Sequence, residues 1–116
     1  MTERIEPWQV WWVDLEPIAG REQGRTRPAI VVSSAFHLRL MQRELITIVP
    51  LTSVDRPSWR HRVPIDAGAK ARGWAITEQI RTISARRFTG NRPIGAVPAK
   101  QAAELRSVLA RMTAFS

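Results

Sequence analysis

The sequence predicts a mainly β, single-domain protein that ends in one helix. Short runs of β-branched and aromatic residues, separated by Gly, Pro and polar residues, recur between residues 8 and 97, and such runs are typical of strands. Only the last stretch of the chain has a helical period. The length of 116 residues suits one domain, residues 1–116, that buries a core of its own.

The first half of the chain predicts three strands. Trp8 to Leu15 reads as a strand because it is aromatic and β-branched and is followed by Glu16-Pro17. Ala29 to Ser33 is almost continuously apolar, which suits a strand buried on both faces. Residues 34–44 have no clean period and predict a loop with at most one helical turn, and residues 45–52 predict the third strand.

The second half predicts shorter strands and the helix. We expect a short strand at 63–65, a loop of small residues at 67–73, alternating strands at 74–77 and 78–83, and a last strand at 94–97. The alternation places Gln79, Arg81 and Ile83 on one face. Pro98 suits the first turn of a helix whose apolar face is formed by Leu105, Val108, Leu109 and Met112.

Charge and composition narrow the class of function. The chain has 18 Lys+Arg against 10 Asp+Glu, a net charge of +8, and this surplus favours nucleic acid, an anionic membrane or an acidic protein segment as partner. It has no Cys and no apolar run of the length of a membrane span, so we expect a cytoplasmic protein that neither spans a membrane nor carries a signal sequence. The preference for Arg over Lys is also explained by a GC-rich genome.

The segment Gly20 to Pro28 is the first candidate binding loop. Arg21, Arg25 and Arg27 lie within seven residues, with Glu22 and Gln23 between them. The planar guanidinium group of arginine matches phosphate in a bidentate manner, and glycine allows a ligand to approach the backbone closely. The loop therefore indicates an anion site, and a solvated basic hairpin is an equally good interpretation.

A second basic loop covers residues 52–62. Trp59 stands there among arginines and His61, and bases of single-stranded nucleic acid stack on such a ring while phosphates meet the cations. Packing of Trp59 on the core is the alternative. No metal-ligand spacing accompanies the isolated His37 and His61, and the sequence predicts no cofactor. Trp8, Trp11, Trp12 and Trp74 exceed what a core of this size needs, so an interface or plain core packing is expected for them.

Four blocks of residues carry a resemblance to a known family. They are Val13-Asp14-Leu15, Gly20 to Gly24 with Arg27-Pro28, Val49 to Ser53, and Glu78 to Ile83. In this order and spacing they resemble the MazF/PemK/Kid family of toxins from bacterial toxin–antitoxin pairs, over nearly the whole chain. The resemblance implies a small, strongly curved antiparallel sheet, an SH3-like barrel of the MazF/Kid/CcdB type, with a C-terminal helix and a two-fold homodimer.

The resemblance also implies an activity and its residues. It implies a metal-independent endoribonuclease that cuts single-stranded RNA at a short sequence, by attack of the 2′-hydroxyl, and whose acidic antitoxin covers the site. By position, Arg27 and Thr52 match catalytic residues, and Glu22 matches a supporting acid that acts as a base or only as an ion-pair partner. The residues expected to bind RNA are Arg21, Gln23, Arg25, Ser53, Trp59, Gln79 and Arg81. His61 is one residue out of register with a histidine common in relatives, and we expect no catalytic role for it.

Two rival functions share this fold prediction. One is a relative that poisons a topoisomerase by binding it, against which the retained Arg27 and Thr52 argue. The other is a non-catalytic barrel that binds RNA or DNA, for which the basic loops would suffice. Both rivals predict binding without cleavage.

Overall fold

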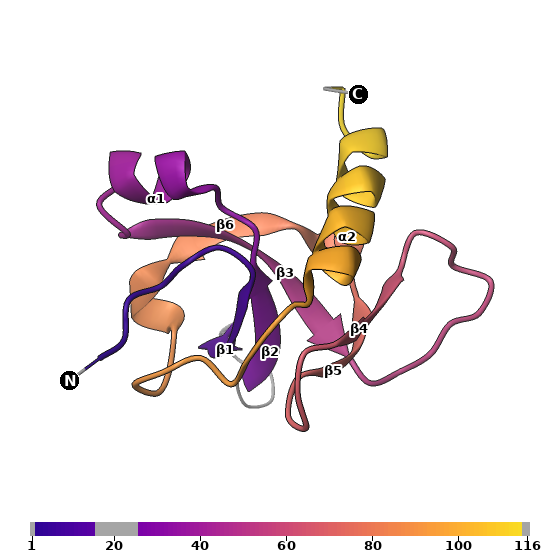
Figure 1. Ribbon diagram of the computed structural model, residues 1–116, viewed down its shortest axis with the longest axis horizontal. Helices are drawn as coiled ribbons and strands as arrows, with labels where there is room; N and C mark the ends of the chain where they lie inside the picture. Colours follow the sequence, from indigo (N-terminus) through magenta and orange to yellow (C-terminus); the bar gives the residue numbers. More distant parts are fainter. Residues whose placement is uncertain (1, 16–25, 115–116) are drawn as a thin grey trace, which may run out of the picture.

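Strand β3 (Leu45–Thr52) lies at the centre of the sheet in the computed structural model, which describes residues 2–15 and 26–114 of the chain. The described strands follow the order β4-β5-β3-β2-β1-β7, with β6 also paired to β3, and every pairing is antiparallel. One edge of β3 pairs with β2, while the other pairs with β6 along its first half and with β5 at its end. The sheet therefore curves strongly around β3 (Figure 1).

The elements agree with most of the sequence prediction. The other strands are β1 (Gln9–Asp14), β2 (Thr26–Val31), β4 (Val63–Asp66), β5 (Arg72–Ala75), β6 (Arg81–Ser84) and β7 (Gly95–Ala96). The helices are α1 (Ala35–Leu40) and α2 (Ala99–Arg111), and the short 3-10 helices are η1 (Thr77–Gln79) and η2 (Ala85–Arg87). The mainly β architecture with a C-terminal helix is thus confirmed. The helix within 34–44 has six residues and is longer than the one helical turn that was expected there.

Three boundaries were predicted wrongly. Arg27 and Pro28 belong to strand β2 rather than to the preceding loop, because they pair with Val13 and Trp12 of β1. Strand β5 starts at Arg72, inside the segment expected to be a loop of small residues. The predicted strand at 78–83 is interrupted, since η1 ends at Gln79 and β6 starts only at Arg81.

Apolar clusters cover both faces of the sheet. One cluster, which includes Ile30 and Leu51, is covered by Leu105 of α2. The other includes Ala29 and Val31 and is covered by Leu38 of α1. Consecutive residues of β2 thus point into different clusters, which confirms the prediction of a strand buried on both faces.

The two helices have local causes in the sequence. Ser34 caps α1, since its side chain accepts a hydrogen bond from the backbone N–H of His37 at 3.0 Å. Pro98 is the N-cap of α2, and Leu105 is fully buried, while Met112 lies just past the helix and is 44% exposed. Figure 1 shows α2 beside β4 and α1 near the start of β3. Neither helix in the described part of the chain has the length and apolarity to cross a membrane.

Candidate active site

The ends of two neighbouring strands bring Arg27 and Thr52 to one place. The pairing of β2 with β3 ends at Ala29, which lies opposite Pro50, and Arg27 and Thr52 each lie two residues beyond this pair at the same end of the two strands. Both residues line one hollow of about 440 Å³ at the end of the two strands, together with Trp12, Pro28, Leu51, Ser53, Val54, Lys70 and Arg72.

The Thr52 hydroxyl is oriented by the chain that follows it. Its Oγ1 accepts a hydrogen bond from the backbone N–H of Val54 at 3.1 Å. This contact uses one lone pair of the oxygen and leaves the hydroxyl hydrogen available to a ligand in the hollow. A neutral donor held in this way can face a phosphate oxygen.

Three cations line the hollow, and the sequence reasoning identified only one of them. The side chains of Arg27 and Lys70 have no hydrogen bond or ion pair to another residue that the structure describes. Arg72 donates from Nε to Oδ1 of Asp66 at 3.0 Å, with both side chains largely exposed. Lys70 and Arg72 were missed because they belong to a turn and strand start that were predicted as a loop of small residues. Their charge is the signal that would have indicated them.

Trp59 lies in a separate cluster on the loop 53–62, which extends away from the sheet (Figure 1). Its ring is 41% exposed and stacks against His61 with a centroid distance of 5.6 Å. The guanidinium carbon atoms of Arg62 and Arg56 lie 4.4 Å and 5.3 Å from the ring centroid. The aromatic and cationic groups predicted for this loop are therefore in contact, but none of them lines the hollow of Arg27 and Thr52.

Glu78 joins this cluster to the sheet. Its carboxylate lies 2.7 Å from Nη2 of Arg62 and 3.0 Å from Nε2 of His61. Burial acts to raise the pKa of Glu78, but the hydrogen bond from Arg62, a backbone hydrogen bond and the charges of Arg62 and His61 outweigh it and lower the pKa below its ordinary value. His61 thus contacts an acid and does not line the hollow of Arg27 and Thr52.

Gln79 and Arg81 lie outside the hollow as well. Gln79 is exposed in η1, so it does not share a strand face with Arg81, contrary to the prediction. Arg81 is exposed and Ile83 is buried, although both lie on β6. Nη2 of Arg81 donates to the carbonyl oxygen of Leu15 at 2.7 Å, so Arg81 is held beside the last residue of the first predicted strand, which precedes the first candidate binding loop. Four predicted site residues of that loop lie outside the described residues: Arg21, Glu22, Gln23 and Arg25.

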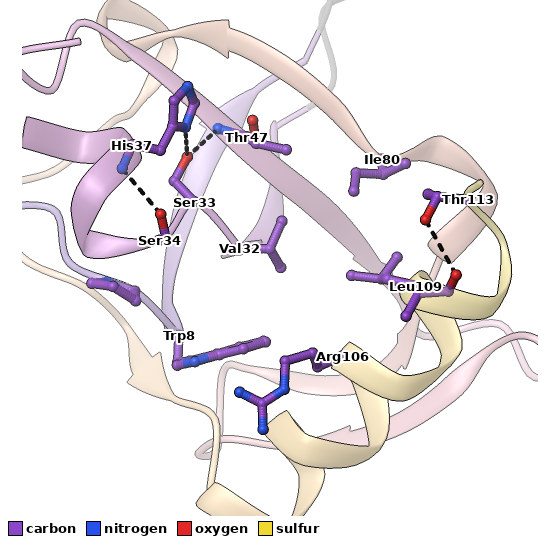
Figure 2. Close-up of a pocket in the computed structure, with 12 residues that line it drawn as sticks. Trp8, Val32, Ser33, Ser34, His37, Thr47, Ile80, Arg106, Leu109 and Thr113 are labelled. Carbon is purple, nitrogen blue, oxygen red and sulfur yellow. Dashed lines mark hydrogen bonds between the residues drawn. The ribbon is translucent and has the colours of Figure 1, made fainter. Parts of the chain in front are cut away.

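A larger and more apolar hollow of about 710 Å³ lies between β3, the C-terminal part of α2 and Trp8. Figure 2 shows Trp8 and Arg106 on one side and Ser33, His37 and Thr47 on another. The buried Ser33 hydroxyl accepts from the N–H of Thr47 at 2.8 Å and lies 2.7 Å from Nδ1 of His37. His37 therefore has a structural partner, and no group of three metal-ligating side chains occurs among residues 2–15 and 26–114.

These features define a class of protein: a small, strongly curved β domain whose basic hollow is lined by an arginine and an oriented hydroxyl. Residues 6–113 match the family model of the PemK-like, MazF-like toxins of type II toxin–antitoxin systems. The chain therefore belongs to this family, which confirms the resemblance found in its sequence.

Individual relatives agree with this assignment. The endoribonuclease MazF9 of Mycobacterium tuberculosis is 39% identical over 108 residues, which are 87% of this chain and 89% of the relative. The endoribonuclease EndoA of Bacillus subtilis is 30% identical over 88 residues, 73% of this chain and 75% of the relative. A MazE–MazF crystal structure from Deinococcus radiodurans superposes with a TM-score of 0.79 at 26% identity and covers 97% of both chains. The predicted curved, MazF-like fold is thus confirmed.

Proposed function

We propose that this endoribonuclease toxin of the MazF type cuts single-stranded RNA at a short sequence without a metal ion, and thereby inhibits translation and growth. Its family and the named activity of its relatives support the endoribonuclease class. The observation that carries the proposed chemistry is that Arg27 and Thr52 line the same open basic hollow. That pair faces a space large enough for a phosphodiester and its ribose.

The proposed reaction is an internal transfer of the phosphoryl group. The ribose 2′-oxygen loses its proton and forms a bond to the adjacent phosphorus, and the bond from phosphorus to the 5′-oxygen of the next nucleotide breaks. That leaving oxygen takes up a proton. The products are a 2′,3′-cyclic phosphate and a 5′-hydroxyl, and because the nucleophile is already attached to the RNA, positioning supplies much of the rate.

Arg27 and Thr52 stabilise the charge that develops at phosphorus. We assign electrostatic stabilisation to Arg27, because a guanidinium with an ordinary pKa above about 12 is a poor proton donor. The Thr52 hydroxyl donates to a phosphoryl oxygen while the Val54 N–H holds its position. Loss of one preorganised donor of this kind typically lowers the rate about 10²–10³-fold.

The remaining predicted site residues enter the proposal as RNA ligands. Glu22 serves as the base or as an ion-pair partner of a neighbouring arginine. Ser53 lines the same hollow as Thr52, which supports a role in binding. The other proposed RNA-binding residues are Arg21, Gln23, Arg25, Trp59, Gln79 and Arg81.

The proposed partners are an acidic antitoxin and a second copy of the chain. The net charge of +8 favours an acidic segment that covers the hollow and excludes RNA. The Deinococcus relative was solved as MazE–MazF, which supports an antitoxin partner. The family resemblance supports the homodimer, and the apolar hollow of Figure 2 offers a surface that a second copy would cover. We propose the cytoplasm as the place of action.

The test is cleavage of a long unstructured RNA in the presence of EDTA, followed by mapping of the fragment ends. Arg27→Gln is compared with Arg111→Gln, which changes an exposed arginine in the last turn of α2. We expect discrete cuts with cyclic-phosphate ends that only Arg27→Gln abolishes. Tight binding with intact RNA would instead support one of the two rivals, a nucleic-acid-binding barrel or an inhibitor of another enzyme.

A further inference from the structure

A second hollow adjoins the one that contains Arg27 and Thr52. It measures about 370 Å³ and is lined by Ser53, Pro64, Ile65, Arg72, Gly73 and Trp74. Ser53 and Arg72 line both hollows, so the two are continuous along the end of the sheet. A strand bound in the first hollow can therefore extend into the second without leaving the surface.

The strand pairing places Trp74 beside Thr52 of the proposed catalytic pair. Thr52 of β3 lies directly opposite Trp74 of β5, and Trp74 lies opposite Pro64 of β4. Opposed side chains share a face, so Trp74 lies beside Thr52, which lines the first hollow together with Arg27. Arg72 lies two residues before Trp74 and therefore on the same face of β5.

Glycine at position 73 is what allows this approach. Gly73 has a φ of +147°, and a Cβ atom there would lie 2.2 Å from the carbonyl oxygen of Thr52. No side chain fits in that space, so only glycine lets β5 run so close to the end of β3. The close approach fixes Arg72 and Trp74 on either side of Gly73, next to Thr52.

Trp12 and Trp74, like Trp59, lie outside both apolar clusters. In the described part of the chain neither belongs to or packs against either apolar cluster, and both are partly exposed. By contrast, Trp11 is 1% exposed and packs edge-on against Phe88. An aromatic ring that lines a hollow beside a cation is a platform for base stacking, because every base has a π face and is followed by a phosphate.

Arg72 supplies that cation. Its Nε is engaged by Asp66, so the fork is held in place while its terminal nitrogens have no partner among the described residues. Its side chain is 67% exposed and borders both hollows. Lys70, in the turn before β5, adds a second positive group to the first hollow.

We propose that the second hollow is a nucleotide subsite for the RNA residue next to the cleavage position. Arg72 binds the phosphate between the two nucleotides, and Trp74 stacks on the neighbouring base. This inference rests on the proposed RNA substrate and extends it to the nucleotide that flanks the cut. An acidic peptide would satisfy Arg72 but would leave the flat face of Trp74 without a matching group.

The test measures binding and cleavage separately. Binding is measured with an RNA oligonucleotide that spans a mapped cut and carries 2′-deoxyribose at that position, which removes the attacking hydroxyl. The variants are Arg72→Gln and Trp74→Leu, with Trp74→Phe as the conservative variant and Lys100→Gln, on exposed α2, as the matched control. The oligonucleotide is also trimmed by one nucleotide at a time from either end.

We expect Arg72→Gln to weaken binding about tenfold or more, and to reduce the slope of log K against log salt by about 0.7, the value for one phosphate contact in a single strand. Trp74→Leu weakens binding about five- to hundredfold and Trp74→Phe restores most of it. KM for cleavage rises while kcat changes by less than about threefold. On the oligonucleotide that lacks the flanking nucleotide, both substitutions lose their effect.

The subsite would be overturned if wild type cleaves RNA and the variants Arg72→Gln and Trp74→Leu bind RNA as tightly as Lys100→Gln does. This result would leave the proposed function intact. Equal losses on trimmed and full-length RNA would also overturn the subsite, because the substitutions would then act on the fold or on the scissile nucleotide. Absence of cleavage by wild type would refute the proposed function. Binding of a long unstructured RNA to wild type, Arg72→Gln and Trp74→Leu would then still report on the subsite, because that measurement needs no mapped cut.

Discussion

Replacement of Thr52 by valine removes one atom group from the proposed site and almost nothing else. Valine has the shape of threonine but has no hydroxyl, so the side chain still fills its place at the end of β3. The substitution deletes the proposed donor to the phosphoryl oxygen and the acceptor for the N–H of Val54, 3.1 Å away. Thr52→Ser keeps both functions and serves as the matched control.

Thr52→Val should affect the stability of the fold and the rate of cleavage to different extents. Val54 is exposed, so water can satisfy its N–H, and the free energy of unfolding falls by about 0.5–1.5 kcal/mol at most. Loss of a preorganised donor to the transition state raises the barrier by about 2.7–4 kcal/mol, which is about 10²–10³ in kcat. The rate effect therefore exceeds the effect on stability.

Single-turnover cleavage of a short RNA, with saturating protein, measures the chemical step directly. Urea unfolding followed by tryptophan fluorescence measures the stability of the same samples. We expect a hundredfold or larger loss of rate in Thr52→Val, and rates within about tenfold of wild type in Thr52→Ser. A rate for Thr52→Val within threefold of wild type would refute the role assigned to the hydroxyl.

Two further predictions concern the support of the site. The pKa of Glu78 is lowered in the folded protein, so its interactions stabilise the fold fully above the ordinary value of 4.5, and this stability is lost as the pH falls through the folded pKa. The unfolding free energy of wild type should therefore exceed that of Glu78→Gln by less below pH 4.5 than above it. A difference that does not change with pH would contradict this explanation. Gly73→Ala should destabilise by about 1–3 kcal/mol or more and slow cleavage, because its Cβ meets Thr52 at 2.2 Å. Gly68→Ala is the control, because Gly68 also has a positive φ of +131° but a Cβ there would lie 3.6 Å from its nearest neighbour. It therefore shows the effect of backbone strain without steric overlap. Equal losses of stability in Gly68→Ala and Gly73→Ala would refute the steric explanation.

Local sequence patterns predicted those strands and helices in which the composition and the spacing of apolar residues favour the same secondary structure. Residues 45–52 are β-branched and apolar, and strand β3 has the bounds that were predicted. The helical period around Leu105 likewise predicted α2. The break at 77–79 was not predictable from alternation, because a 3-10 turn and a strand differ there in hydrogen bonding rather than in apolar pattern. The N–H of Gln79 donates to the carbonyl of Ile76 at 2.9 Å instead of to a strand.

The site residues that match the motifs of the family could be predicted from the sequence. The site residues that long-range strand pairing brings to the hollow could not. Arg27 and Thr52 are far apart in sequence but line the same hollow, and that they act together stays a prediction. Arg72 and Trp74 reach the same face only because β5 pairs with the end of β3. That pairing depends on Gly73, because only glycine lets the backbone of β5 lie so close to Thr52. A run of small residues in the sequence does not indicate this close approach.

The distribution of positive charge explains why the hollow, rather than the whole surface, should recognise RNA. Arg62 is 9% exposed, is paired with Glu78 and lies over Trp59, so its charge is largely committed within the protein. Arg27 and Lys70, by contrast, have no carboxylate partner among the described residues and line one hollow. A phosphate that enters this hollow gains the full attraction of both cations without displacing an internal ion pair. We therefore propose that the net charge of +8 steers RNA toward the protein in general, and that the cations beside Thr52, which have no carboxylate partner among the described residues, determine where it binds.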